Sequence, residues 1–120
     1  MAEDNELNWE IAYELLRELE LELEWAENGK ICADMFQQSA PGYYDAVLMD
    51  IRMPVMNGYE ATDTIRAMDR PDAGLPIIAM TADAFSEDIQ KCLDHGMNAH
   101  VAKPIDINEV ARLLKRHLDA

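Results

Sequence analysis

Two short apolar runs, each followed at once by a polar residue, set the fold class of this chain. Residues 46–49 (AVLM) lead into Asp50, and residues 77–80 (IIAM) lead into Thr81. Short, continuously apolar runs are typical of parallel strands that are buried on both faces. Segments with the apolar spacing of helices lie between them, which predicts a parallel sheet covered by helices on both faces.

The same patterns predict the remaining elements. Helices are expected over residues 5–19, 29–38, 58–68, 86–95 and 107–118, and a short strand over residues 98–102. Leu and Glu alternate before Trp25, which predicts a half-polar edge strand over residues 21–25. Asn28 and Ser86 are expected as N-caps, Asp106 and Glu109 as a capping box, and Gly96 as a left-handed helix stop.

Composition narrows the class of protein. With 120 residues, 49% of them hydrophobic, the chain is expected to form a single domain over residues 1–120. A formal net charge of −14 opposes contact with a phosphate backbone, so nucleic-acid binding by this domain is not expected. Cys32 and Cys92 form no metal-ligand motif, and no run reaches the length of a membrane span. These features predict a cytoplasmic domain without membrane contact.

Polar side chains are expected to meet at one edge of the sheet. Asp50, Thr81 and Lys103 each follow a predicted strand, while Glu3 and Asp4 precede the first helix. Because the carboxyl ends of parallel strands share one edge, three carboxylates, a hydroxyl and an ammonium should gather there. Carboxylates this close repel one another unless a hard cation such as Mg²⁺ offsets their charge. A cation, a lysine and a hydroxyl around a central aspartate indicate phosphoryl chemistry.

Several motifs resemble the receiver (response regulator) domain of two-component signalling, and most closely the receivers of hybrid sensor histidine kinases. The matching segments are DNELN at 4–8, AENGK at 26–30, VLMDIRMPVMNGYEAT at 47–62, PIIAMTA at 76–82 and AKPI at 102–105. The resemblance implies a flavodoxin-like, doubly wound α/β fold with a parallel sheet in the order 2-1-3-4-5.

The resemblance also implies roles for the acidic residues. Asp50 would accept a phosphoryl group from a phosphohistidine of a sensor histidine kinase or histidine phosphotransfer domain. Asp4, Asp50 and the backbone carbonyl of Arg52 would bind Mg²⁺, with Glu3 acting through a water molecule. Such a domain catalyses its own phosphorylation and hydrolysis and turns over no separate substrate.

The resemblance also implies roles for other residues, according to their positions in the matching motifs. Thr81 and Lys103 would each contact a phosphoryl oxygen, with a cis peptide expected between Lys103 and Pro104. Thr81 and His100 would form the conformational switch, although His100 replaces the more common Tyr or Phe. Arg52 and Asp83 would tune the lifetime of the phosphorylated state.

One departure concerns the first strand of the sheet. Only Met1 and Ala2 precede Glu3, where the family has an apolar strand in the middle of the sheet. The first strand is therefore expected to be missing or truncated. Three explanations stay open: upstream residues are absent from this sequence, another chain donates an element, or the sheet rearranges. An open sheet edge would also favour a homo-oligomer.

Two other functions compete with phosphoacceptance. An aspartate-nucleophile phosphatase shares the Asp, Thr, Lys and magnesium, but Arg52 stands where those enzymes carry a general acid. A phosphorylation-silent interaction module, or a strand-swapped scaffold, would retain the fold without the chemistry. A test of phosphorylation at Asp50 separates these functions.

Overall fold

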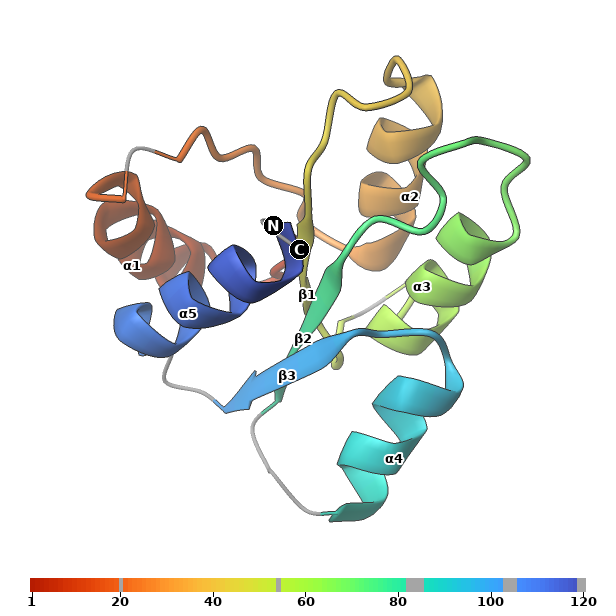
Figure 1. Ribbon diagram of the computed structural model, residues 1–120. Coiled ribbons are helices and arrows are strands. Elements are labelled where there is room, and N and C mark those ends of the chain that lie inside the picture. Colours follow the sequence, from red (N-terminus) through yellow and green to blue (C-terminus); the bar gives the residue numbers. More distant parts are fainter. Residues whose placement is uncertain (20, 54, 82–85, 103–105, 119–120) are drawn as a thin grey trace.

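The computed structural model contains a parallel three-stranded sheet, counted over the residues that it describes (Figure 1). The described residues are 1–19, 21–53, 55–81, 86–102 and 106–118. The strands lie in the order β1 (Val47–Asp50), β2 (Ile77–Thr81) and β3 (Ala99–Ala102). The two apolar runs identified in the sequence thus form adjacent central strands, and every residue of β1 and β2 is buried.

The register of the sheet brings the polar strand ends to one edge. Asp50 pairs with Met80, and Thr81 pairs with Ala102. Thr81 therefore follows the partner of Asp50, and Lys103 follows the partner of Thr81 in the sequence. Parallel strands in this register carry their C-terminal residues to a common rim.

Alternate side chains of the strands enter two separate cores. Val47 and Met49 of β1 pack in one cluster with Ile77 and Ala79 of β2. Leu48 of β1 packs in the second cluster, which also contains Ile78, Met80, Val101, Val110 and Leu114. Burial of both faces explains why the strands are apolar throughout and do not alternate with polar residues.

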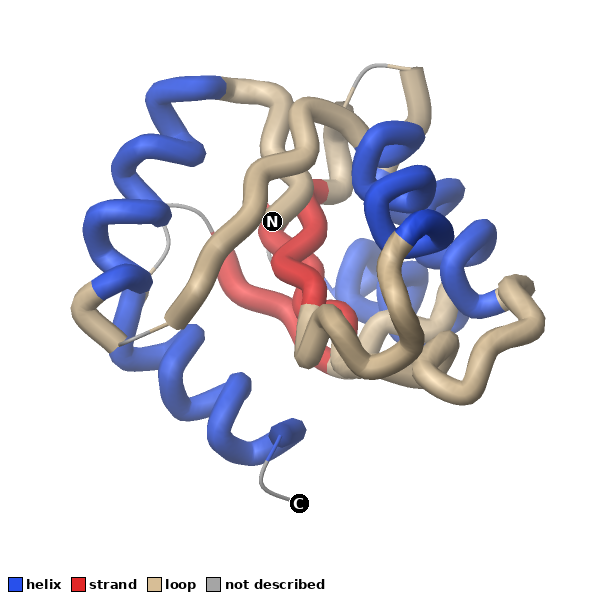
Figure 2. The backbone as a smooth tube through the Cα atoms, turned by 90° about the horizontal axis from the view of Figure 1, so that it is seen from above, coloured by secondary structure: helices blue, strands red, loops and turns tan. Residues whose placement is uncertain are grey.

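Helices cover both faces of the sheet (Figures 1 and 2). Those on one side are α1 (Glu6–Arg17) and α5 (Ile107–Leu118). Those packed on the other core are α2 (Gly29–Gln38), α3 (Gly58–Arg66) and α4 (Ser86–Asp94). No helix in the described part of the chain is long and apolar enough to cross a membrane.

The first residues of the chain fill the position beside β1. Ala2 forms parallel bridges to both Ala26 and Met49, so it lies between these two segments. Its N–H donates to the Leu48 carbonyl at 2.8 Å, and its carbonyl accepts from the Asp50 N–H at 3.0 Å. Because the Ala26 segment lies on the far side of Ala2, the order of segments agrees with the expected 2-1-3-4-5 sheet. The first strand is thus reduced to isolated bridges around Ala2, as the short start of the sequence predicts.

Two local predictions were wrong. Residues 21–25 form no strand. Within the described residues, this segment and Ala26 bond to a neighbouring backbone only through Glu24, which accepts from the Met1 amine, and through Ala26, which pairs with Met1 and Glu3. The alternation instead reflects half-burial of Leu21 and Leu23 against the α1 and α5 core. Ser86 is the first residue of α4 and not its N-cap.

Other helix boundaries agree with the predicted caps. The Asn28 side chain accepts from the Ile31 N–H at 2.9 Å and begins α2. Asp106 accepts from the N–H of Asn108 at 2.8 Å at the start of α5. Gly96 follows α4 with φ of 94°, the left-handed conformation expected there. These contacts satisfy backbone groups that a helix end leaves without partners.

Gly58 lets α3 begin directly against the end of β1. A Cβ atom added at this glycine would lie under 3.0 Å from the carbonyl oxygen and the Cα atom of the Asp50–Ile51 segment. The Gly58 N–H also donates to the Ile51 carbonyl at 2.8 Å. The backbone of α3 therefore supports the strand end that carries Asp50.

We expect Gly58→Ala to lower the free energy of unfolding by about 1–3 kcal/mol, because a backbone contact must open to admit the methyl group. Gly74→Ala is the matched control, since an added Cβ there meets nothing within 4 Å. The control should change stability by less than about 1 kcal/mol. Urea unfolding followed by circular dichroism measures both variants, and equal effects would contradict the close contact.

Candidate functional site

Asp50 lies at the rim where β1 ends. Its side chain is buried, with 5% of the residue exposed. One carboxylate oxygen, Oδ1, accepts from the Arg52 N–H at 3.3 Å. The β1–β2 pairing and the contact with Gly58 hold its backbone on two sides. Asp50 is therefore a buried carboxylate on a rigid strand end.

Glu3 and Asp4 meet Asp50 at this rim. One carboxylate oxygen from each of the three residues lies within 4.8 Å of the other two. Glu3 is 1% exposed, whereas Asp4 is exposed. The hydrogen bonds of Ala2 to Leu48 and Asp50 bring this pair beside β1. The structure thus brings together the three carboxylates that the sequence analysis expects at one edge.

Neighbouring backbone and amide groups orient the Glu3 carboxylate. Its Oε1 atom accepts from the Asn5 N–H at 3.2 Å and from Asn8 Nδ2 at 3.5 Å. Asn5 is also the N-cap of α1, since its side chain accepts from the Asn8 N–H at 3.0 Å. The start of α1 therefore positions the acidic pair and places helix N–H groups near negative charge, which is electrostatically favourable.

Thr81 presents a buried hydroxyl at the end of β2. The residue is 4% exposed, and its Oγ1 atom has no hydrogen-bond partner within the part of the chain that the structure describes. Buried hydroxyl groups almost always have a partner, so a buried hydroxyl without one needs an explanation. A ligand oxygen at the rim would provide the missing partner.

The remaining predicted site residues differ in how far the structure describes them. Arg52 is exposed, and His100 is half-buried on β3, where it pairs with Ala79. Lys103, Pro104 and Asp83 lie outside the described residues. Their predicted roles, including the cis peptide before Pro104, therefore stay predictions.

The loop after Asp50 contains a residue in an uncommon backbone conformation. Val55 has φ of 71° and is 78% exposed. A β-branched residue in the left-handed region is strained, and strained positions are often found near functional sites. The sequence gives no signal of this conformation, because valine is not a residue that favours it.

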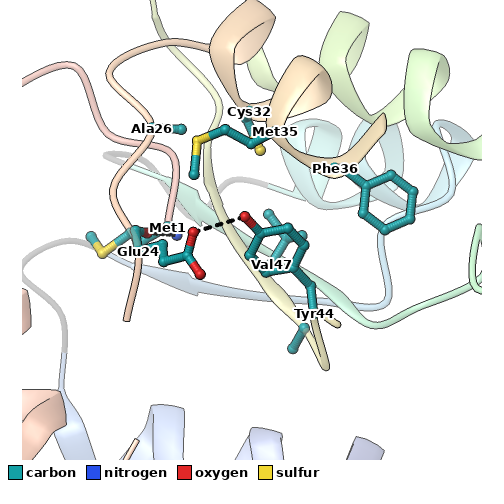
Figure 3. Close-up of a pocket in the computed structure, with 9 residues that line it drawn as sticks. Met1, Glu24, Ala26, Cys32, Met35, Phe36, Tyr44 and Val47 are labelled. Carbon is teal, nitrogen blue, oxygen red and sulfur yellow. Dashed lines mark hydrogen bonds between the residues drawn. The ribbon is translucent and has the colours of Figure 1, made fainter. Parts of the chain in front are cut away.

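A small cavity lies between the start of the chain, α2 and the N-terminal end of β1 (Figure 3). It has a volume of about 30 Å³, and its lining includes Glu24, Cys32 and Phe36. Tyr44 donates a hydrogen bond to Glu24 at 2.9 Å, and burial together with this bond raises the pKa of Tyr44 to about 12. Burial also raises the pKa of the Cys32 thiol. Burial therefore makes the Cys32 thiol a weak nucleophile.

Comparison with known proteins agrees with this geometry. The model of the response regulator receiver domain family matches residues 1–115. The chain belongs to the response regulator receiver family.

The receiver domain is similar to parts of much longer kinases. It is 38% identical over 109 residues to hybrid signal transduction histidine kinase I of Dictyostelium discoideum, a match that covers 88% of this chain and 6% of the relative. It is 37% identical over 118 residues to probable histidine kinase 2 of Oryza sativa subsp. indica, with 88% and 11% covered. The chain thus spans a small part of either kinase.

Solved receiver structures share the fold. The receiver domain of a Pseudomonas aeruginosa sensor histidine kinase, with a magnesium ion coordinated in its active-site cleft, superposes with a TM-score of 0.88 at 37% identity. That match covers 99% of this chain and 94% of the other. A Saccharomyces cerevisiae receiver domain, crystallised with a histidine phosphotransfer signalling protein, gives 0.85 at 25% identity, with 98% and 86% covered. The expected flavodoxin-like receiver fold is confirmed.

We expect Thr81→Val to leave the free energy of unfolding of this receiver domain unchanged or to raise it by up to about 1 kcal/mol. The change removes a buried hydroxyl that makes no hydrogen bond to any residue the structure describes, and with it a desolvation penalty. Thr62→Val is the control, because the buried Thr62 Oγ1 donates to the Gly58 carbonyl at 2.8 Å. The control should lose about 1 kcal/mol. Comparable losses in urea unfolding of the two variants would contradict the assignment of Thr81 Oγ1.

Proposed function

We propose that this receiver domain accepts a phosphoryl group from a phosphohistidine onto Asp50 in a Mg²⁺-dependent reaction. The observation that carries the proposal is the group of Glu3, Asp4 and Asp50 carboxylate oxygens within 4.8 Å of one another. A second observation, the buried hydroxyl of Thr81 without a partner among the described residues, supports a ligand at the same rim.

Asp50 would act as the nucleophile. A carboxylate oxygen of Asp50 forms a bond to phosphorus while the bond between phosphorus and the histidine nitrogen breaks, and the electron pair of that bond stays on the imidazole. The product is an acyl phosphate at Asp50 and a histidine that takes up a proton from solvent. The burial of Asp50 excludes much of the water that would otherwise hydrate the reacting oxygen.

The cluster of three carboxylates fits a magnesium ion. The oxygen atoms that magnesium prefers as ligands are present at the rim, where one carboxylate oxygen of each residue lies within 4.8 Å of the other two. Asp4 and Asp50, with the backbone carbonyl of Arg52, would hold the ion, and Glu3 would act through a water molecule. The exposure of Asp4 also leaves room for the water molecules that magnesium retains. When bound, magnesium would offset negative charge on the carboxylates and on the transferring phosphoryl oxygens.

Other residues would recognise the phosphoryl group and respond to it. The Thr81 hydroxyl would donate to a phosphoryl oxygen, which satisfies its hydrogen-bonding capacity. Lys103 would pair with another oxygen, since an ammonium group offsets phosphoryl charge. His100 would take part in the switch with Thr81, because both residues belong to neighbouring strands. The phosphorylated state would then favour one of two arrangements of these strand ends.

The proposed partner is a sensor histidine kinase or a histidine phosphotransfer domain. The similarity to hybrid histidine kinases and to a receiver crystallised with a histidine phosphotransfer protein supports this choice. The net charge of −14 speaks against nucleic acid as the partner. We place the domain in the cytoplasm, where thiols such as those of Cys32 and Cys92 stay reduced. Self-association through an open sheet edge stays a prediction.

Acetyl phosphate with Mg²⁺ should add one phosphoryl group to the chain, and Asp50→Asn should abolish this addition. Intact-mass spectrometry measures the adduct. Asp45→Asn is the matched control, because Asp45 is an exposed carboxylate that precedes the opposite end of β1. The control should be phosphorylated like the parent chain.

Beryllofluoride with Mg²⁺ gives an independent readout of the same site. Amide resonances near Thr81 should shift in the parent chain and stay in place in Asp50→Asn. A chain that gains no phosphoryl group and shows no amide shift would contradict the proposal. That result would favour the phosphorylation-silent scaffold.

Arg52 is proposed to tune the lifetime of the acyl phosphate, because its side chain lies two residues after Asp50 and is exposed at the rim. Arg52→Ala should shorten the lifetime by admitting water to the phosphoryl group. Decay of the phosphorylated mass measures the rate. Arg17→Ala, an exposed arginine at the end of α1, is the control and should leave the rate unchanged. An unchanged rate in Arg52→Ala would refute this role.

A further inference from the structure

The Glu3–Asp4 peptide has one contact that the proposed phosphoryl chemistry does not use. The Trp25 indole N–H donates to the carbonyl oxygen of Glu3 at 2.8 Å. This carbonyl belongs to the peptide unit that joins the two acidic residues. Because a peptide unit is planar, a hydrogen bond to its oxygen restricts the orientation of the chain on both sides.

The indole takes the place of a backbone partner. The Glu3 N–H donates to the Ala26 carbonyl at 3.0 Å, and Ala26 donates back to the Met1 carbonyl at 2.9 Å. In a regular parallel ladder the next rung to Glu3 would come from residue 28. Asn28 instead forms the N-cap of α2. The ladder therefore ends at Ala26, and a side chain from the same segment binds the Glu3 carbonyl.

Trp9 holds the Trp25 ring in place. The two indole rings are stacked, with centroids 5.7 Å apart and an angle of 6° between their planes. Trp9 lies in the first turns of α1, where its backbone N–H donates to the Asn5 carbonyl at 3.0 Å. Both tryptophans are half-buried, so the stack removes only part of their surface from water. The α1 helix and the Ala26 segment thus contact each other beside the acidic pair through this stack.

We propose that Trp25, supported by Trp9, is a positioning residue that sets the affinity of the Glu3, Asp4 and Asp50 cluster for magnesium. This inference rests on the proposed function, because it assumes that the cluster binds the ion. Trp25 acts through the backbone, because its indole N–H donates to the Glu3 carbonyl and not to a carboxylate. Groups that orient metal ligands from outside commonly change metal affinity by about 10- to 100-fold when they are removed.

The same geometry provides a spectroscopic signal. Trp9 and Trp25 are the two tryptophans of the chain, so its tryptophan emission reports on this stack alone. A cation that draws the carboxylates together changes the field and the hydrogen bond at the Trp25 indole. Titration with MgCl₂ should therefore change the emission, and in Trp9→Phe the change should persist from Trp25 alone.

The test compares magnesium affinity among variants by isothermal titration calorimetry with MgCl₂. Trp25→Phe keeps an aromatic ring but removes the N–H donor, and its dissociation constant for Mg²⁺ should rise about tenfold. Trp9→Phe keeps the donor, so its dissociation constant should rise less. Tyr43→Phe is the aromatic control; it removes a hydrogen bond to the Glu24 carboxylate but leaves the Trp25 donor to the Glu3 carbonyl in place, and it should bind like the parent.

A second variant separates the hydrogen bond from packing and from folding. Replacing Trp25 by benzothienylalanine keeps the size and stacking of the ring and puts sulfur in place of the N–H group. Its midpoint of urea unfolding without Mg²⁺ should match that of the parent, while its magnesium affinity should fall as in Trp25→Phe. A purely structural role would move the midpoint and the affinity together.

Two results would overturn the inference, and they are distinguishable. If the parent chain binds Mg²⁺ and both Trp25 variants bind with the same dissociation constant, the positioning role is wrong and the proposed function stands. If the parent chain gives neither heat nor an emission change with MgCl₂, the proposed magnesium site fails and the inference fails with it.

Discussion

Four backbone hydrogen bonds around Ala2 hold the acidic rim together. They join Met1, Ala2 and Glu3 to Ala26 on one side and to Leu48 and Asp50 on the other. Ala2 has only a methyl side chain to bury, so its position depends on directional contacts with both neighbours. The placement of Glu3 and Asp4 beside Asp50 follows from this ladder. Without it, the adjacent pair Glu3 and Asp4 would not share a site with Asp50, which lies 46 positions after Asp4 in the sequence.

The electrostatics of the rim oppose the folding that creates it. Three carboxylates within 4.8 Å repel one another, and burial of Glu3 and Asp50 deprives them of water. The Asn5 and Asn8 donors and the start of α1 offset part of this cost at Glu3. A bound divalent cation would offset more, and it would stabilise the folded state because the unfolded chain offers no such cluster.

The sequence was informative where one strong pattern decided the structure. Burial on both faces made β1 and β2 recognisable, and the residues that end them marked the rim. Asn28 and Asp106 predicted helix starts because side-chain caps are local interactions. The prediction of a strand over residues 21–25 was wrong. Alternating apolar and polar residues indicate only that one side of a segment is buried, whereas a strand also needs a hydrogen-bonded neighbouring strand. The Trp25 contact with Glu3 joins residues 22 positions apart, and no local pattern predicts it.

The close approach of Gly58 to the backbone of Asp50 has a mechanical consequence. On the α3 side there is no space for even one additional carbon atom, so the main chain at Asp50 has nothing to retreat into. On the other side lie β2 and the Thr81 hydroxyl, which has no hydrogen-bond partner among the residues described. The main chain at Asp50 is therefore held from two sides, and a rearrangement of the rim that displaced it would also have to displace α3 or β2.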